Sequence, residues 1–346
     1  MTEERKMLTY RYVPAVHFHY TVKNHENPSE FDNILGEKWE EAEEHGVFRY
    51  KLRIKSKILP GRYKFLAQLN CERGTKRRPP ESIESMSQPF HRDRFNFTKL
   101  NASEILLNIE DETTGNYEIA VNASPIEYAH CLFLPNRMAC LPQIITEASL
   151  FKVLDLLLLS NSPYLRIIFN SLGAHASVNH LHWHLYYLKY EMLLEHIELQ
   201  GLEGPLFALE NYPAKGFCFK LSSFVDRDVK SFASWAYFLI NYLQQNEIPH
   251  NVYITRAKTD RQDEYYDDIR IYIWARKASF GIKNTEIFIP AVSELFGHLI
   301  IRSKDDFENL TEETVVPLFN DVTGETFDAT KKEIVDKIAT KIGAKS

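Results

Sequence analysis

Cysteine is scarce in this sequence. The 346 residues include four cysteines, none in a C-x-x-C pair, namely Cys71, Cys131, Cys140 and Cys218. This spacing argues against a disulfide scaffold and favours a reduced intracellular protein. Long apolar runs are also lacking, because the longest stretch, 153–159, is interrupted by Asp155 and the charged N-terminus is followed by no apolar signal core. We therefore expect a soluble, cytoplasmic protein.

An excess of positive charge is lacking as well. Lys and Arg number 41 against 47 Asp and Glu, a formal net charge of −6 at pH 7. Overall charge therefore draws the protein neither to nucleic acid nor to a membrane, and any phosphate binding must be local. The composition, with 44% hydrophobic and 25% charged residues, is globular and excludes disordered and fibrous classes.

Helical and strand-like patterns recur in both halves of the chain, whose length fits two modules better than one ordinary domain. Apolar residues at helical spacing predict helices over 30–44, 146–160, 226–245 and 328–342, the third capped by Asp226. Apolar or alternating stretches predict strands over 65–69, 117–121, 130–134, 165–169, 251–254 and 268–274. The polar segment 71–97 is predicted to be a long functional loop. This mixture favours an α+β fold.

Three histidines alternate with apolar residues in one short segment. Leu181 and Trp183 separate His180, His182 and His184. Because side chains alternate between the two faces of a strand, the three imidazoles are predicted to share one face. Three interpretations fit this pattern: ordinary surface or core histidines, a metal site, and nucleophilic catalysis on phosphorus.

Spacing weakens the metal interpretation. His180 and His184 would start about 13 Å apart along a strand, whereas imidazole ligands sit about 2 Å from zinc. One ion would bind two of the histidines more readily than all three. An uncharged imidazole nitrogen attacks phosphorus at neutral pH without a metal. We favour this third interpretation, in which His182 attacks and its neighbours orient it and stabilise developing charge.

A family resemblance points the same way. Segment 180–186 resembles the histidine-triad pattern, and other segments resemble the GDP-hexose phosphorylases of the histidine-triad/galactose 1-phosphate uridylyltransferase-like superfamily, namely 59–70, 88–90, 95–99, 124–130 and 140–143. The match extends from about Leu59 to about Arg302. His184 stands where the plant members have Gln, so the chain is more similar to the animal members, which act on GDP-D-glucose.

The resemblance implies a HIT-like fold, with antiparallel sheets, flanking helices and two fused triad-like halves. Residues 1–200 would form the N-terminal half with the active histidine strand, and residues 201–346 the C-terminal half without a triad. The two halves are expected to form one compact unit.

The resemblance also implies a two-step reaction. His182 would attack the α-phosphorus of a GDP-hexose, expel hexose 1-phosphate and carry GMP on its imidazole. Inorganic phosphate would then attack this adduct to give GDP. His180 and His184 would flank the nucleophile, and no cofactor or metal is implied.

Binding residues are expected near the triad. Asn170, Ser177, Gln68 and Asn70 are candidates to contact substrate, and the loop cations are candidates to bind phosphate because guanidinium forks match phosphate oxygens, namely Arg73, Lys76, Arg77 and Arg78. Expected partners are GDP-hexose and inorganic phosphate, without nucleic acid or membrane, and the length is compatible with a homodimer. Two alternatives stay open: a histidine-triad nucleotide hydrolase, and a non-catalytic regulator that binds nucleotide or metal.

Overall fold

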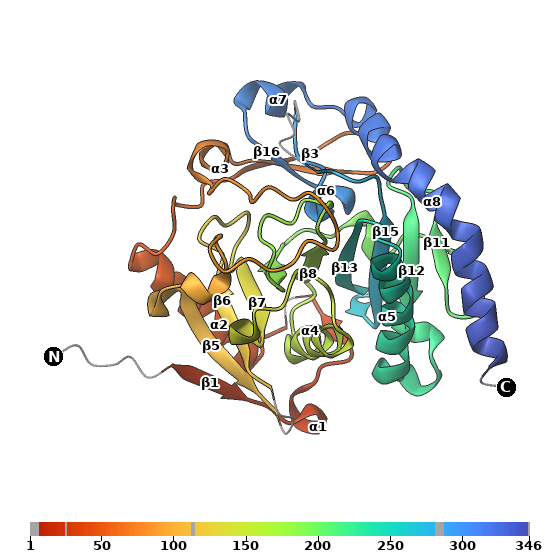
Figure 1. The fold of residues 1–346 in the computed structure, drawn as a ribbon, viewed down its shortest axis with the longest axis horizontal. Coiled ribbons are helices and arrows are strands. Elements are labelled where there is room, and N and C mark those ends of the chain that lie inside the picture. Colours follow the sequence, from red (N-terminus) through yellow and green to blue (C-terminus); the bar gives the residue numbers. More distant parts are fainter. Residues whose placement is uncertain (1–6, 25, 112–114, 281–286, 345–346) are drawn as a thin grey trace.

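A computed structural model describes residues 7–24, 26–111, 115–280 and 287–344 of the chain. Within these residues, eleven strands form one sheet that crosses the molecule (Figure 1), and only the edge pair β1–β5 is parallel. In order across the sheet, the strands are β1 (Leu8–Arg11), β5 (Ile105–Glu110), β6 (Tyr117–Val121), β7 (Cys131–Pro135), β9 (Trp183–Tyr187), β8 (Leu165–Asn170), β13 (His250–Ala257), β15 (Asp268–Ala275), β12 (Gly216–Lys220), β11 (Phe207–Leu209) and β10 (Gln200–Gly201).

Small sheets and helices surround this sheet. The small sheets are β2 (Val22–Lys23) with β14 (Tyr265–Tyr266), and β4 (Leu66–Leu69) between β3 (Lys55–Ile58) and β16 (His298–Ile301). The α-helices are α1 (Pro14–His17), α2 (Glu30–Glu44), α3 (Cys71–Lys76), α4 (Glu147–Leu159), α5 (Val229–Gln245), α6 (Val292–Leu295), α7 (Lys304–Asn309) and α8 (Glu312–Gly343). Of the 3₁₀ helices, η1 (Phe97–Lys99) and η2 (Ala102–Glu104) matter for the site. No helix in the described ranges has both the length and the apolar character of a membrane span.

The strand order repeats within the large sheet. The succession β6-β7-α4-β8-β9 gives the spatial order β6-β7-β9-β8, and β11-β12-α5-β13-β15 gives the matching order β11-β12-β15-β13. The two units join where β8 and β13 pair antiparallel, with Asn170 opposite Asn251. The α+β prediction with mainly antiparallel strands is confirmed. The division of the chain at residue 200 stays a prediction.

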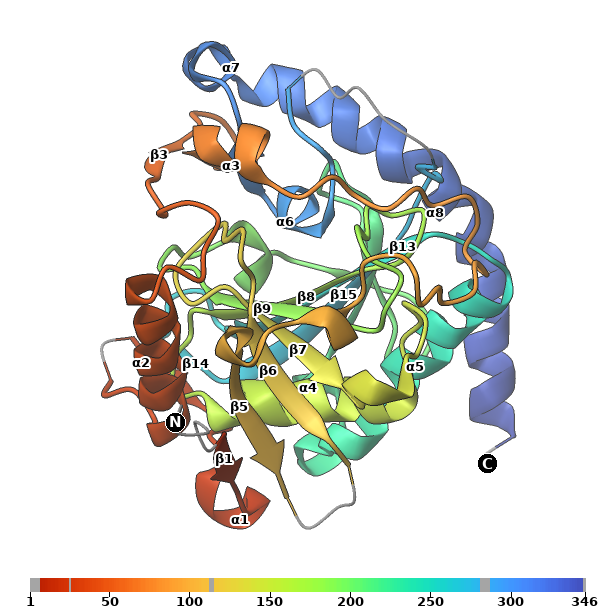
Figure 2. The same ribbon diagram turned by 60° about the vertical axis from the view of Figure 1, so that its left-hand side comes forward.

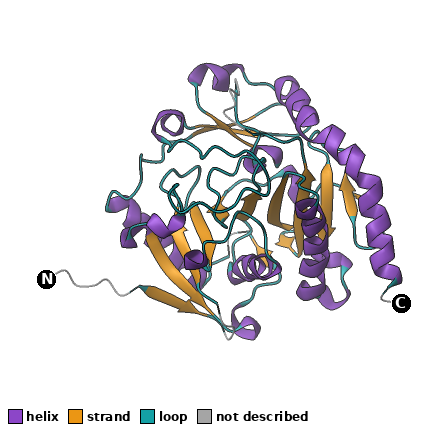
Figure 3. Ribbon diagram, in the orientation of Figure 1, coloured by secondary structure: helices purple, strands orange, loops and turns teal. Residues whose placement is uncertain are grey.

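The two faces of β9 lie in different surroundings. Trp183 and Leu185 pack in the apolar core that contains the leucines of α4, whereas Tyr186 packs in a second core with Tyr253 and Tyr272. Because alternate residues of a strand face opposite sides, His184 lies on the side away from α4. Figure 3 shows loops gathered over the middle of the molecule, between α3 and α4 in that view. The histidines therefore lie where loops, rather than a helix, cover the sheet.

Most predicted elements are present, with three differences. Segment 71–97 was predicted to be loop throughout but begins with helix α3, because the Asn70 side chain accepts a hydrogen bond from the Arg73 amide and caps it. Helix α5 is capped by Asp228 rather than Asp226, which has a positive φ of 51°. The C-terminal helix α8 starts at Glu312, well before the predicted residue 328, with Pro317 inside it.

Candidate active site

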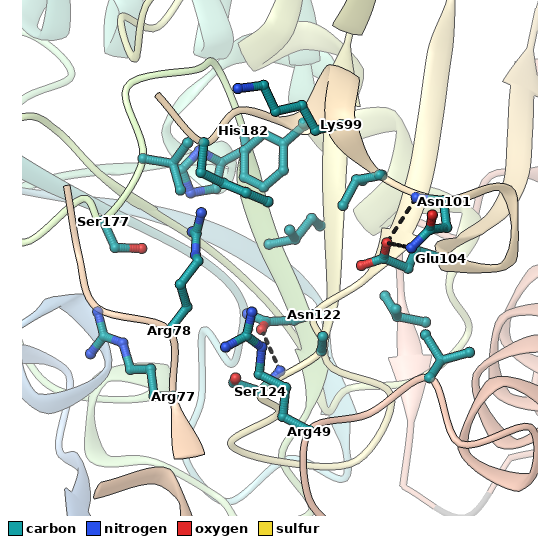
Figure 4. A pocket seen from close by; sticks show the side chains of 18 of the residues that line it. Arg49, Arg77, Arg78, Lys99, Asn101, Glu104, Asn122, Ser124, Ser177 and His182 are labelled. Atoms are coloured by element: carbon teal, nitrogen blue, oxygen red, sulfur yellow. Dashed lines mark hydrogen bonds between the residues drawn. The ribbon is translucent and has the colours of Figure 1, made fainter. Parts of the chain in front are cut away.

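A cavity of about 590 Å³ opens beside the histidine segment. Its walls come from loops and strand ends that lie far apart in the sequence, and all of its lining residues lie between His45 and His184. His182 and His184 both line it, together with Ser177 and a group of cationic side chains. Figure 4 shows His182 and Arg78 on one side of this cavity, with Asn101 and Glu104 on the other.

The His182 ring is held in one tautomer. Its Nδ1 lies 2.7 Å from the carbonyl oxygen of His180, and since a carbonyl only accepts, Nδ1 carries the proton. The Nε2 atom therefore has the free lone pair. Burial, with the nearby charge of Arg78, lowers the pKa of His182 to about 4, so the ring is neutral at pH 7. A neutral imidazole with a free Nε2 is the form that attacks phosphorus.

Gln143 fixes the backbone on which this ring stands. Its side-chain Oε1 accepts a hydrogen bond from the His182 amide (2.9 Å), and its Nε2 donates to the carbonyls of His182 (3.1 Å) and Asn170 (3.0 Å). The predicted single strand through all three histidines is wrong in this respect, because β9 starts only at Trp183. The preceding residues bond to segment 141–143 instead of to a neighbouring strand, and the Leu181 amide donates to the Leu141 carbonyl.

A chain of hydrogen bonds sets the tautomer of His184. The Ile126 amide donates to Nδ1 of His130 (3.1 Å), so His130 carries its proton on Nε2. This Nε2 lies 3.1 Å from Nδ1 of His184, which must accept, and the His184 proton is left on Nε2. Burial lowers the pKa values of both rings well below 6.5. His184 is therefore a neutral hydrogen-bond donor at the cavity wall.

His180 and Phe97 support the His182 ring from the other side. The Phe97 amide donates to Nδ1 of His180 (3.1 Å), and the Phe97 ring centroid lies 4.9 Å from that of His182. The ring of Phe90 packs against His180. His180 does not line the cavity, and its carbonyl is the group that orients His182.

Five cationic side chains line the same cavity, namely Arg49, Arg73, Arg77, Arg78 and Lys99. Arg73 donates to the Ser124 carbonyl, and Lys99 donates to the carbonyls of Asp93 and Arg94. Within the described part of the chain, the guanidinium groups of Arg49, Arg77 and Arg78 have no hydrogen-bond acceptor or carboxylate partner. Burial and the neighbouring cations lower the pKa of Arg77 to about 9, and the pKa of Arg78 falls to about 10 for similar reasons. An anionic ligand would relieve this clustered positive charge.

Comparison with protein families shows to which family the chain belongs. The family model "GDPGP1-like, N-terminal domain" matches residues 30–186, and "GDPGP1-like, C-terminal domain" matches residues 199–341. The chain belongs to the GDPGP1-like family. It is 39% identical over 307 residues to human GDP-D-glucose phosphorylase 1, covering 85% of this chain and 79% of the relative.

More distant relatives agree with the GDPGP1-like assignment. The chain is 31% identical over 336 residues to GDP-L-galactose phosphorylase 2 of Arabidopsis thaliana, covering 87% of this chain and 74% of that protein. Among solved structures, the yeast Ap4A phosphorylase Apa2 in complex with Ap4A superposes with a TM-score of 0.60 at 13% identity, over 85% of this chain and 97% of that one. This likeness shows the HIT-like fold that the sequence predicts.

The predicted site residues of this GDPGP1-like chain fall into two groups. Those that line the cavity are His182, His184, Ser177, Arg73, Arg77 and Arg78. Lys76 lies elsewhere, in a surface ion pair with Glu72, and the Asn70 side chain caps α3 and donates to the Pro125 carbonyl. Lys76 and Asn70 therefore contact other parts of the protein and do not face the cavity.

Gln68 and Asn170 lie in buried hydrogen-bond networks next to the cavity. Gln68 accepts from Nε2 of His298 (2.6 Å) and donates to Glu127 (2.7 Å). The Oδ1 of Asn170 accepts from Asn251 (2.7 Å) and from the Val292 amide (3.1 Å). Neither lines the cavity.

Sequence reasoning gave no role to several residues of the site. His130, Gln143 and Lys99 lie within segments that resemble the family. The contacts of His130 with His184 and of Gln143 with His182 join residues far apart in the sequence. Arg49 follows helix α2 and carried no local signal. Its amide donates to the Ala123 carbonyl (2.8 Å), and this contact brings the arginine to the cavity.

Proposed function

We propose that this member of the GDPGP1-like family is a GDP-hexose phosphorylase that acts on GDP-D-glucose. The observation that carries the proposal is a neutral, oriented imidazole with a free Nε2 at the wall of a cavity lined by five cations. The identity to human GDP-D-glucose phosphorylase 1 supports the choice of sugar nucleotide.

The first step forms a bond between Nε2 of His182 and the α-phosphorus. The bond from the α-phosphorus to the oxygen that bridges to the β-phosphate breaks, and hexose 1-phosphate leaves with that oxygen and its electron pair. Arg77 and Arg78 offer fork-shaped donors to the phosphate oxygens. Stabilisation of charge on the equatorial oxygens, together with positioning of the nucleophile, supplies most of the catalysis.

The second step regenerates the enzyme. An oxygen of inorganic phosphate attacks the phosphorus of the GMP–histidine adduct, the N–P bond breaks, and GDP leaves. The departing imidazole is neutral because the carbonyl of His180 keeps the proton on Nδ1. The site must hold two anions beside each other, which agrees with its surplus of cations over carboxylates.

The acceptor distinguishes this proposal from the hydrolase alternative. Purified protein is incubated with GDP-glucose with and without inorganic phosphate, and the nucleotides are separated by chromatography. We expect GDP and glucose 1-phosphate only with phosphate, and at most one equivalent of protein-bound GMP without it. Free GMP that accumulates without phosphate would indicate hydrolysis, and survival of all GDP-sugars would refute the phosphorylase proposal.

The same proposal includes a cytoplasmic, water-soluble enzyme that needs neither nucleic acid nor membrane. Its net charge of −6 supports this part. A homodimer is compatible with the proposal.

A further inference from the structure

Glu104 is the one carboxylate among the described residues that line the cavity. It ends helix η2, immediately before strand β5. In Figure 4 its side chain lies to the right, with Asn101, whereas His182, Arg77 and Arg78 lie to the left. A carboxylate beside a polyphosphate would repel it, so its place at the other end of the cavity calls for a ligand group that donates hydrogen bonds.

The two oxygens of Glu104 differ in their contacts. Oε2 accepts from the Asn101 amide (2.8 Å) and from the Asn101 side-chain Nδ2 (3.2 Å), so both of its lone pairs are used. Oε1 accepts no hydrogen bond from the described residues, and in Figure 4 it points away from Asn101. A carboxylate oxygen has two lone-pair sites. The free oxygen can therefore accept from two neighbouring donors.

Apolar side chains stand next to this carboxylate. Ile105, the next residue, pairs with Ala120 of β6, and Ala120 pairs with Leu132 of β7. This register brings Glu104 near the side chains of Val121 and Leu132, and these line the cavity together with Val47 and Leu100. Apolar walls with a single acceptor suit the faces and one edge of a planar base.

We propose that Glu104 binds the edge of the guanine base and selects guanine nucleotides. Oε1 would accept hydrogen bonds from N1–H and from the exocyclic N2 amino group, two adjacent donors that match its two free lone pairs. Adenine has no hydrogen at N1 and would leave the carboxylate facing an acceptor. Uracil offers one N–H between two carbonyl oxygens. This inference rests on the proposed function for the rest of the substrate, since the phosphates must lie among the cations.

Hexose hydroxyls also donate to carboxylates, so the experiment must separate base from sugar. The Glu104→Gln variant keeps one oxygen for the cap on Asn101 but replaces an acceptor with a donor. The matched control is Glu110→Gln, which changes an exposed carboxylate at the far end of β5 that pairs with Arg11. Each protein is assayed with GDP-glucose, inosine diphosphate glucose, which lacks the N2 amino group, and GDP-mannose.

We expect Glu104→Gln to lower kcat/KM for GDP-glucose about 10² fold and to reduce the preference for guanine over hypoxanthine about tenfold. The glucose-to-mannose ratio should stay within twofold, and the control should match the wild type. An unchanged guanine-to-hypoxanthine ratio would overturn the inference. A changed glucose-to-mannose ratio would assign the carboxylate to the sugar and overturn it as well.

Direct binding keeps this test independent of turnover. GMP and IMP are titrated into the wild type and into Glu104→Gln by calorimetry. We expect the wild type to prefer GMP and the variant to lose that preference. If no GDP-hexose reacts but this difference is present, the proposed function fails and the inference about Glu104 holds. If GDP-glucose reacts but neither ratio responds to the variant, only the inference fails.

Discussion

Strands β9 and β15 occupy matching places in the repeated strand order, yet their side chains have different roles. His184 of β9 pairs with Leu132 on one side and Ile168 on the other, and Tyr272 of β15 pairs with Cys218 and Tyr253 in the same way. Two residues earlier along each segment stand His182 and Arg270. The triad positions of the first unit are thus matched by Arg270 and Tyr272 in the second.

The difference lies in how the polar groups of the two strands are satisfied. Tyr272 donates to the Leu194 carbonyl (2.5 Å), and Arg270 donates to the carbonyls of Leu194 (3.1 Å) and Ile197 (2.9 Å). Segment 190–197 therefore closes this face. Over β9 the loops leave a cavity, and Nε2 of His182 keeps an unused lone pair. The same strand order gives a packed core where segment 190–197 covers β15, and a cavity where the loops stand off from β9.

The largest expected effect is a loss of turnover from a substitution in the histidine segment, which a substitution at the matching place in β15 should not cause. His182→Asn removes the nucleophile and should lower kcat by about 10⁴ fold or more. Tyr272→Phe removes two buried hydrogen bonds, one donated to the Leu194 carbonyl and one accepted from Arg270, so the free energy of unfolding should fall by about 1–3 kcal/mol while kcat stays within twofold. Turnover assays and urea unfolding measure both. A comparable loss of kcat in Tyr272→Phe would show that the second strand takes part in catalysis.

Substitution of a cation in the cavity should lower kcat/KM, whereas substitution of a cation at the surface should not. Arg78→Ala removes a guanidinium from the cavity, and we expect kcat/KM for GDP-glucose to fall about 10² fold. Arg78→Lys should recover part of this loss, because an ammonium keeps the charge but not the fork. Lys76→Ala is the control, since Lys76 pairs with Glu72 at the surface, and it should change kcat/KM less than twofold. Equal losses in Arg78→Ala and Lys76→Ala would contradict this assignment.

A smaller effect is expected at His130, which acts through His184. His130→Phe removes the closer of two donors to Nδ1 of His184, since His130 lies 3.1 Å and the Asn122 side-chain amide 3.5 Å from this atom, so kcat should fall about tenfold with little change in KM. His130→Gln keeps a donor at similar reach and should restore part of kcat. If His130→Phe raised KM and left kcat intact, its role would be to shape the cavity rather than to position His184.

The last expected effect is a pH dependence of stability to which His182 contributes. Burial lowers the pKa of His182 from about 6.5 to about 4, so between these values the unfolded chain binds a proton that the folded chain does not. The free energy of unfolding should therefore fall as pH drops from 6.5 to 4, by up to about 1.4 kcal/mol per pH unit for this ring.

Variants separate the contribution of this histidine. His182→Asn should reduce the slope of unfolding free energy against pH by up to one proton, whereas Tyr272→Phe should leave the slope as it is, because neither Arg270 nor Tyr272 titrates in this range. Urea unfolding at pH 7, 6 and 5 measures the slope. An identical slope in His182→Asn and the wild type would mean that His182 titrates alike in the folded and the unfolded chain, which would contradict the lowered pKa.

Local patterns in the sequence predicted most elements but not their partners. The apolar residues of 30–44 predict helix α2 with the bounds it has, because one amphipathic face suffices to identify a helix. The triad rings do come together, with centroids of His182 and His184 5.0 Å apart. The strand start at Trp183 was not predictable, since it depends on Gln143, some forty residues earlier.

The residues of the candidate site likewise divide into those that a local pattern predicted and those that it did not. Arg77 and Arg78 were identified from their loop, but Lys76 was grouped with them because a local pattern does not show that α3 directs it to Glu72 one turn earlier. His298 and Glu294 are both buried, and His298 bonds to Gln68 and Tyr186, which are distant in the sequence. Which side chains meet across a sheet is decided by long-range register, and a single sequence does not contain that information in readable form.

The series of hydrogen bonds from the Ile126 amide through His130 to His184 has a chemical consequence. This series begins at a peptide N–H, a neutral group, and not at a carboxylate. It can keep an imidazole in one tautomer but offers no negative charge to stabilise an imidazolium. Such an arrangement is poorly suited to reactions whose leaving group must be protonated as it departs, as an amine or an alkoxide must. A phosphate monoester, with a second pKa of about 6, leaves as an anion and makes no such demand.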